Sequence, residues 1–351
     1  MDILPRKGNS EAFEAFVSAL RETECQSHIV KILEMPVEKE KSDDNLASQI
    51  FQLKEENAQQ VKLRKGSEMI CMGLRHKYEK PHQTETVWKA AESPLSQCST
   101  CYGRVEEING TITIATDKRH LYRFAENKWE DSRVSVNMCR LMKCNEKGYC
   151  LIEDDRNVSR HISEIENSTE VLAVLPNNHQ LLCVSAIGHK DKIYVVGGTD
   201  SYFNPKPVIS VLDVTTSKWI KLKDMSCGRS SCSLTTIDNK LYVGSGVCLS
   251  GSTNVECFDL KAEAWTSIHP TTNTMCHLSS LYDKLVATGG RCKGKSSNAV
   301  EVYDNATDSW FPLPSMEERR LHHGVCTTED DKLFVVGGWC SSDLVECFQL
   351  P

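Results

Sequence analysis

Asp191-Lys-Ile-Tyr-Val-Val-Gly-Gly198 is the first of four closely similar octets in this sequence. The others begin at Asn239, Asp283 and Asp331, so successive copies start 48, 44 and 48 residues apart. Self-similarity at such a period is typical of proteins built from repeated structural units. Each octet has turn-forming residues, then β-branched or aromatic residues, then glycine, which predicts a turn followed by a short buried strand. The structural glycines predicted here are Gly197, Gly198, Gly244, Gly246, Gly289, Gly290, Gly337 and Gly338.

A tryptophan recurs in phase with the octets. Trp219, Trp265 and Trp310 lie 46 and 45 residues apart, and Trp129 lies 90 residues before Trp219, which is two periods. The spacing predicts four strands per unit, as in a propeller blade, with each indole packed between neighbouring sheets. These residues and the octets resemble the kelch repeat over roughly residues 84–351. The resemblance implies an all-β, six-bladed kelch β-propeller.

Two weaker repeats precede the four clear ones, and the last repeat ends without a fourth strand. Trp88 lies in a segment that can supply this strand, because Trp88 and Asn109 are 21 residues apart and Trp219 and Asn239 are 20 apart. We therefore expect an N-terminal strand around Trp88 to complete the last blade and close the ring, which removes exposed sheet edges.

The N-terminal part divides into two segments. Residues 1–35 are expected to be helical. The sequence from Ile3 to Thr23 resembles the C-terminal part of a caspase-recruitment domain (CARD). An ordinary amphipathic helix pair is the alternative. Residues 36–83 are highly charged and predict a helical linker or a short coiled coil. Residues 84–351 form the predicted propeller.

Composition narrows the class of protein. The formal charge of −7 and the pI near 5.9 argue against general nucleic-acid binding. No stretch is apolar enough to predict a membrane span, and no apolar signal core is present, so we expect a cytoplasmic protein. The 17 cysteines are an odd number, which disfavours a closed disulfide framework. Six of them are expected to pack in the innermost strands rather than bind metal: Cys101, Cys139, Cys183, Cys232, Cys276 and Cys326.

The sequence predicts no catalytic residue, no metal site and no cofactor. Walker, Gly-x-Ser-x-Gly and His-Glu-x-x-His motifs are absent. His322 and His323 are adjacent and would face opposite sides of a strand, so they are poorly placed to share a metal.

Recognition of a protein partner is expected from the loops between second and third strands, because variable loops on a rigid scaffold commonly bind. Aromatic residues there offer anchors, and cationic residues offer a complement to an acidic motif. Arg229 and Arg320 precede inner strands, and for them structural hydrogen bonding is as plausible a role as partner binding. Redox sensing is conceivable at Cys248, Cys292 and Cys340. The candidate partner-binding residues are Tyr202, Phe203, Asn204, Arg229, Arg291, Lys293, Lys295, Arg320 and Trp339.

These features predict a non-enzymatic adaptor whose propeller loops bind a protein. The CARD-like resemblance implies a link, through a death-fold partner of residues 1–35, to apoptotic or innate-immune signalling. The resemblance to BTB–kelch propellers implies the alternative of a substrate-recognition subunit of a cullin ubiquitin ligase, and other kelch proteins suggest actin or cytoskeleton binding. The oligomeric state is left open.

Overall fold

The computed structural model describes the strand Trp88–Ala91 and residues 105–116, 119–125, 128–248, 255–339 and 345–349. All of them belong to the second of two compact units, which comprise residues 1–83 and 84–351. The predicted helices of residues 1–35, their CARD-like resemblance and the linker of residues 36–83 lie outside the described residues and stay predictions.

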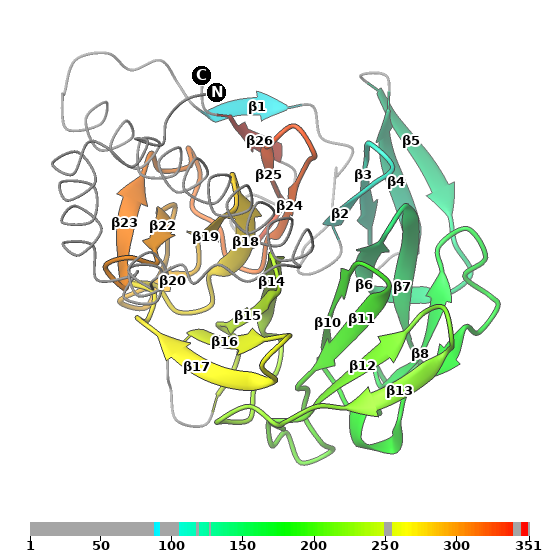
Figure 1. Cartoon of the computed structure of the whole chain (residues 1–351). Coiled ribbons are helices and arrows are strands. Elements are labelled where there is room, and N and C mark those ends of the chain that lie inside the picture. Colours follow the sequence, from blue (N-terminus) through cyan, green and yellow to red (C-terminus); the bar gives the residue numbers. More distant parts are fainter. Residues whose placement is uncertain are drawn as a thin grey trace, which may run out of the picture. The chain divides into compact units, whose positions relative to one another are not determined.

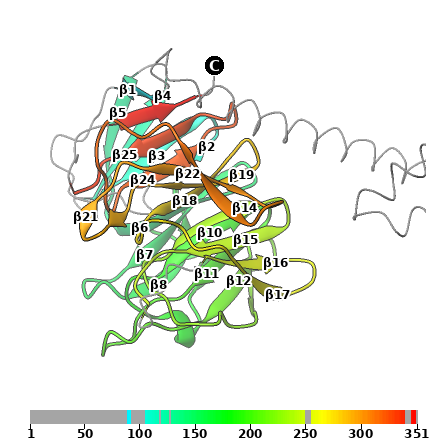
Figure 2. The ribbon, with the colours of Figure 1, turned by 90° about the vertical axis from the view of Figure 1, so that its left-hand side faces the viewer.

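Six four-stranded antiparallel sheets form the blades of a β-propeller (Figures 1 and 2). Blade 1 comprises β2 (Val105–Ile108), β3 (Thr111–Ala115), β4 (His120–Ala125) and β5 (Lys128–Arg133). Blade 2 comprises β6 (Asn137–Cys144), β7 (Lys147–Glu153), β8 (Ser159–Glu164) and β9 (Ala173–Val174). Blade 3 comprises β10 (Ser185–His189), β11 (Lys192–Val196), β12 (Ile209–Asp213) and β13 (Lys218–Lys221).

The remaining blades follow the same plan. Blade 4 comprises β14 (Ser233–Ile237), β15 (Lys240–Gly244), β16 (Val255–Asp259) and β17 (Ala264–Ile268). Blade 5 comprises β18 (His277–Leu281), β19 (Lys284–Thr288), β22 (Val300–Asp304) and β23 (Ser309–Leu313), with a small hairpin of β20 (Arg291–Cys292) and β21 (Lys295–Ser296) between its middle strands. Blade 6 comprises β24 (Gly324–Thr327), β25 (Leu333–Val336), β26 (Val345–Phe348) and β1 (Trp88–Ala91). The only helix in the described residues is a 3₁₀ turn at Asn177–His179.

The ring is closed by strands from opposite ends of the propeller sequence. β1 pairs antiparallel with β26, with Trp88 opposite Phe348 and Ala91 opposite Val345. Figure 1 shows these two strands side by side at the outer part of blade 6. The fourth strand of blade 6 therefore comes from the segment around Trp88, and β26 is paired on both sides, with β25 and with β1.

The octets form second strands, as predicted, but the glycines do not all have the same role. The octets contribute β11, β15, β19 and β25. Gly197 has φ +63°, and a Cβ there would lie 2.2 Å from the carbonyl oxygen of Arg229, so a side chain has no room. In the second octet Ser245, with φ 59°, takes this left-handed position. Gly244 lies instead within β15, where a Cβ would meet Leu278 of the next blade at 2.7 Å.

The hydrophobic core lies between adjacent blades, and the repeated tryptophans pack there as predicted. Trp265 in blade 4 packs on the cluster shared with blade 3, and its indole donates to the carbonyl of Lys223 at 2.7 Å. Trp310 repeats this arrangement one blade further on, donating to the carbonyl of His269 at 2.8 Å. The rings of Trp265 and Trp310 thus each add apolar burial and one inter-blade hydrogen bond.

The prediction for the repeated cysteines is partly wrong. Cys232 and Cys276 are buried just before inner strands, but Cys183 is exposed. Cys183 has φ 54°, the left-handed position that precedes the inner strand, and Val184 occupies the buried place beside it. Of the other predicted positions, Cys139 and Cys326 are buried within β6 and β24, and Cys101 lies outside the described residues.

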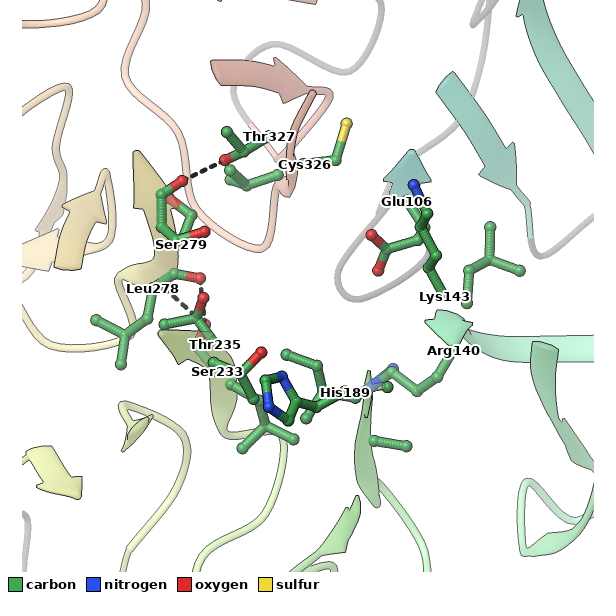
Figure 3. Close-up of a pocket in the computed structure, with 18 of the residues that line it drawn as sticks. Glu106, Arg140, Lys143, His189, Ser233, Thr235, Leu278, Ser279, Cys326 and Thr327 are labelled. Atoms are coloured by element: carbon green, nitrogen blue, oxygen red, sulfur yellow. Dashed lines mark hydrogen bonds between the residues drawn. The ribbon is translucent and has the colours of Figure 1, made fainter. Parts of the chain in front are cut away.

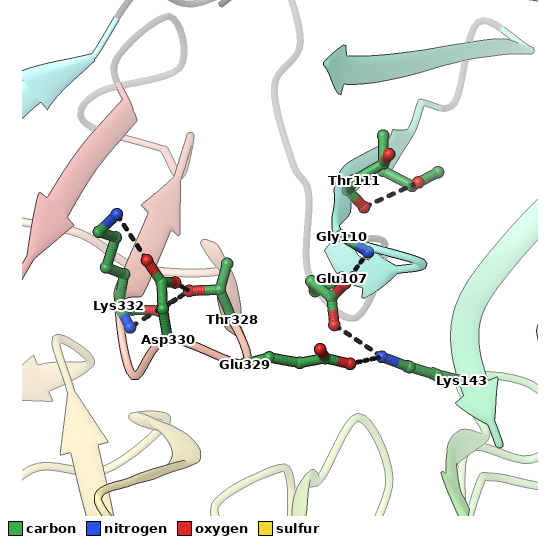
Figure 4. Close-up of polar contacts among 9 residues, drawn as sticks. Glu107, Gly110, Thr111, Lys143, Thr328, Glu329, Asp330 and Lys332 are labelled. Atoms are coloured by element: carbon green, nitrogen blue, oxygen red, sulfur yellow. Dashed lines mark hydrogen bonds and ion pairs between the residues drawn. The ribbon is translucent and has the colours of Figure 1, made fainter. Parts of the chain in front are cut away.

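Ion pairs of one lysine link blades 1, 2 and 6 (Figure 4). Lys143 of blade 2 donates to Glu107 of blade 1 at 2.8 Å and to Glu329, in the β24–β25 turn of blade 6, at 2.9 Å. Burial alone would lower the pKa of Lys143, but the two carboxylates outweigh burial and raise it. Blade 1 and blade 6, the first and last in the sequence, are therefore also connected through the side chain of Lys143.

Candidate functional site

The two ends of the propeller carry different connections. In an antiparallel four-stranded blade, the loop from the second to the third strand and the loop from the fourth strand to the next blade emerge at the same end. We call this end the loop face and define it by the described residues of the second-to-third loops of blades 3–6, which are 197–208, 245–248, 289–299 and 337–339, together with the described blade-to-blade loops beside them. Short turns between first and second and between third and fourth strands occupy the other end.

Blade 3 presents two aromatic residues from a tightly bonded loop. Tyr202 and Phe203 are 83% and 74% exposed. The carboxylate of Asp200 accepts hydrogen bonds from the backbone N–H groups of Tyr202 and Asn204 at 2.9 and 3.0 Å, and Lys206 donates to it at 2.6 Å. These bonds, the Lys206 contact first, lower the pKa of Asp200. The loop is thus fixed by an ionised carboxylate, and Asn204 is part of this framework rather than a free contact residue.

Blade 5 has three cationic residues on the β20–β21 hairpin, of which Figure 2 labels strand β21. Lys293 and Gly294 have φ values of 46° and 81°, which forms a tight two-residue turn. Arg291 donates from Nε to the carbonyl of Gly294 at 3.1 Å. Arg291, Lys293 and Lys295 are all exposed, and no described acidic residue forms an ion pair with them. Their charges are available for a ligand.

Blade 6 places Trp339 on the same face. Its side chain is 64% exposed, and its ring packs against His322 with a centroid distance of 4.7 Å. The backbone N–H of Trp339 donates to the carbonyl of Leu321 at 2.9 Å, which fixes the start of the loop. Val247 of blade 4, 52% exposed, adds a further apolar side chain. Four consecutive blades therefore contribute exposed aromatic, apolar or cationic residues to the loop face.

Arg229 and Arg320 are placed differently from the other candidates. Both side chains are fully buried. Arg320 donates from Nε and Nη2 to one oxygen of Glu346 at 3.0 and 2.6 Å, and from Nη1 to the carbonyl of Gly337 at 2.7 Å. Arg229 bonds to Glu256 in the same way, at 3.3 and 3.1 Å. The contacts support the structural alternative, because neither guanidinium reaches the surface where a partner would bind.

Each arginine connects two blades. The carbonyl of Arg320 accepts from the N–H of Gly290 in blade 5 at 2.9 Å, while its guanidinium holds Glu346 in blade 6. At the equivalent place before blade 5 the chain has Asn273, which donates to the carbonyl of Gly289 at 2.9 Å. The glutamate partners of the two arginines were not predicted from the sequence, although each glutamate follows its arginine at a similar distance along the chain, 27 and 26 residues.

A central channel passes between the first strands of the six blades and contains a cavity of about 410 Å³ (Figure 3). Several of its hydroxyl groups bond across blades. Ser185 donates to the carbonyl of Cys232 at 2.7 Å, and Thr327 donates to that of Ser280 at 2.5 Å. Burial raises the pKa of Glu106, on the channel wall, to about 8. These contacts explain the polar lining as part of the ring's construction.

His277 lines the channel and packs against the buried His323, with ring centroids 5.9 Å apart. Burial lowers the pKa of His277 to about 4, and His323 bonds through Nε2 to the hydroxyl of Thr288 at 2.9 Å. His322 packs against Trp339, and both adjacent histidines lie before β24, which begins at Gly324, rather than in a strand as the sequence analysis expected. Within the described ranges, no group of three His, Cys, Asp or Glu side chains could hold a metal ion. The helical content of those ranges includes nothing long and apolar enough to cross a membrane.

The six four-stranded sheets, the glycine-terminated second strands and the inter-blade tryptophans define a kelch-type β-propeller. Residues 160–338 match the KLHDC2/KLHL20/DRC7 Kelch-repeats domain, and the chain belongs to this kelch-repeat family. The kelch resemblance seen in the sequence is thereby confirmed.

Known relatives share this part of the chain. Kelch-like protein 26 of Danio rerio is 25% identical over 228 residues, which cover 61% of this chain and 37% of that protein. A putative F-box/kelch-repeat protein of Arabidopsis thaliana is 34% identical over 109 residues, which cover 29% of this chain and 27% of that one. The solved structure of YjhT matches with a TM-score of 0.57 and 14% identity, covering 72% of this chain and 95% of YjhT, and shows the fold alone. The matched part thus spans well under half of each curated relative.

Proposed function

We propose that the loop face binds a segment of a partner protein and that the chain acts as a non-enzymatic, cytoplasmic interaction adaptor. The observation that carries this proposal is the exposed pair Tyr202 and Phe203 on a loop fixed by Asp200. Large aromatic side chains held in place before binding lose little conformational entropy on association and are common energetic centres of interfaces.

The charges of the hairpin indicate the chemistry of the partner. Arg291, Lys293 and Lys295 project from a protein of formal charge −7, so they form a local positive region on an otherwise acidic chain. An acidic peptide segment with an apolar side chain complements both this region and the aromatic pair of blade 3. The charges favour rapid association that weakens with salt.

The test compares full-length variants in affinity capture with quantitative mass spectrometry. Tyr202→Ser/Phe203→Ser removes the aromatic pair, and Lys293→Glu/Lys295→Glu reverses two hairpin charges. Ile220→Ser removes an exposed apolar residue of β13. Lys218→Glu with Lys261→Glu reverses one exposed charge at the start of β13 and one in the turn before β17, so these variants serve as matched controls. The proposal expects one set of proteins to be lost from both loop-face variants and kept by both controls. Equal loss in all four would contradict it.

A second candidate function is substrate recognition for a ubiquitin ligase. It is supported by the F-box named in the Arabidopsis relative and by the resemblance to BTB–kelch propellers. The same capture distinguishes the two, because this function requires cullin machinery among the retained proteins. Cosedimentation of the chain with filamentous actin would favour the cytoskeletal alternative instead.

The CARD-like segment adds a proposal that rests on the sequence alone. A death-fold partner bound through residues 1–35 would link the propeller to apoptotic or innate-immune signalling. Phe13→Glu in the full chain would then release that partner while leaving the proteins bound at Tyr202 and Phe203 unchanged. Loss of no protein from the Phe13→Glu sample would contradict this link.

A further inference from the structure

Two cysteines from different loops are in contact on the loop face. Cys227 lies in the loop that leads into blade 4, and Cys248 lies in the second-to-third loop of that blade. Their sulfur atoms are 3.3 Å apart, with the thiol of Cys248 donating to Cys227. Neither forms a disulfide in this structure, and both are half-buried. A disulfide needs an S–S distance of about 2.05 Å, so the sulfurs would need to approach by about 1 Å.

The backbone around the two cysteines is fixed by hydrogen bonds. Ser230 and Val247 exchange two backbone hydrogen bonds, at 3.1 and 2.9 Å, and each lies near one of the cysteines in sequence. The Sγ atom of Cys227 also lies 3.9 Å from Oε1 of Glu256, the carboxylate that Arg229 binds. The backbone bonds therefore hold the two segments that carry the cysteines beside each other.

The chain contains a natural comparison at the next blade. Cys292 has the same place in the second-to-third loop of blade 5, two residues after the glycine position, and it is also half-buried. The residue equivalent to Cys227 is Thr271, two residues before Asn273. Cys292 thus has the setting of Cys248 without a second cysteine at the facing position.

We propose that Cys227 and Cys248 are a redox-responsive dithiol that closes into an intramolecular disulfide on exposure to hydrogen peroxide. In the first step one sulfur attacks a peroxide oxygen, the O–O bond breaks, and a sulfenic acid and one water form. In the second step the other sulfur attacks the sulfenic sulfur, the S–O bond breaks, and the oxygen leaves as a second water with the remaining thiol proton. Two thiols and one peroxide thereby give one disulfide and two waters, each sulfur losing one electron.

The reaction should become faster with rising pH. Burial, followed by the thiol contact with Cys248, raises the pKa of Cys227 to about 11. Thiolates rather than thiols are the nucleophiles in these steps, so a raised pKa makes closure slow at neutral pH and faster in alkali. The expected dependence on pH can be measured by following closure at two pH values with the same peroxide concentration.

The bond would join two loops of the proposed binding surface, between the aromatic pair of blade 3 and the cationic hairpin of blade 5. It would restrict the second-to-third loop of blade 4 at its entrance, beside the exposed Val247. The dithiol does not depend on the proposed function, because its formation is measured in the isolated protein.

The experiment uses the reduced full-length chain. It is treated with hydrogen peroxide, its remaining thiols are blocked with iodoacetamide, and its peptides are mapped by mass spectrometry with and without dithiothreitol. We expect a linked peptide pair containing Cys227 and Cys248, about 2 Da lighter than the sum of the reduced peptides. The link should disappear with dithiothreitol, and Cys292 should not be joined to either of them.

Two variants sharpen the result. Cys227→Ser should leave Cys248 unlinked and trappable as a sulfenic acid by dimedone, while Cys292→Ser should leave the Cys227–Cys248 link unchanged. The proposal is overturned if, in the unmodified chain, both cysteines remain as accessible to iodoacetamide after peroxide as Cys292, or if Cys248 becomes linked to a different cysteine.

Discussion

Replacement of Arg320 by Met tests how the blades are held together. Met keeps an unbranched apolar side chain but removes the guanidinium, which makes two hydrogen bonds to the carboxylate of Glu346 and one to the carbonyl of Gly337. Glu346, whose side chain is only 2% exposed, would then keep only the N–H groups of Glu317 and Glu318. Removing one member of a buried ion pair costs about 3–5 kcal/mol, because the remaining charge stays desolvated. For a domain of this size the melting temperature should fall by on the order of 10 °C.

The assay is equilibrium unfolding in urea at pH 7, followed by tryptophan fluorescence. Lys332→Met is the control, because its ion pair with Asp330 is largely exposed and such pairs contribute little. The double variant Arg320→Met/Glu346→Gln should recover part of the loss, since it removes the unpaired charge and keeps an acceptor for the backbone N–H groups. If Arg320→Met were no less stable than Lys332→Met, the argument that this pair fixes the segment between blades 5 and 6 to blade 6 would fail.

Three further predictions concern other parts of the propeller. Burial lowers the pKa of His277 from 6.5 to about 4, so between these pH values the folded state binds fewer protons than the unfolded state. The free energy of unfolding should therefore fall with decreasing pH by up to about 1.4 kcal/mol per pH unit. An unfolding series from pH 7 to 5 should show a shallower slope for His277→Gln, and an equal slope would contradict this. Trp310→Phe loses the bond to the His269 carbonyl and part of the buried ring, so it should cost about 1–3 kcal/mol in urea unfolding, and an unchanged midpoint would count against the inter-blade role. Asp200→Ala should speed hydrogen exchange at the Tyr202 amide and weaken partner capture, whereas unchanged exchange would mean that the carboxylate does not fix the loop.

Local sequence pattern predicted the repeating elements well because the blade is a local unit. The octets identify second strands, and the tryptophans identify fourth strands, since both signals depend on residues close in the chain. The position of Trp88 relative to the period also indicated the strand that pairs with β26. The octet pattern does not show which residue takes the left-handed conformation, and in the second octet Ser245 takes it rather than Gly244.

Contacts between blades could not be derived from the repeat alone. The pairing of Arg320 with Glu346 depends on how a loop turns inward, and the closeness of Cys227 and Cys248 depends on two loops lying side by side. Cys183 was expected in an inner strand, but a shift of one residue places it on the surface. The candidate binding residues of blades 3, 5 and 6 are exposed in loops, as the sequence indicated. Their role in binding stays a prediction.

The central claim is that the loop face is the partner-binding surface. Its most direct test is hydrogen exchange with mass spectrometry on the full chain, with and without a protein recovered in the capture experiment. The account predicts slower exchange at residues 200–206 and 291–296 in the complex, with little change in the third-to-fourth strand turns near Lys218 and Lys261. Protection confined to those turns, with both loops exchanging as in the free chain, would contradict it.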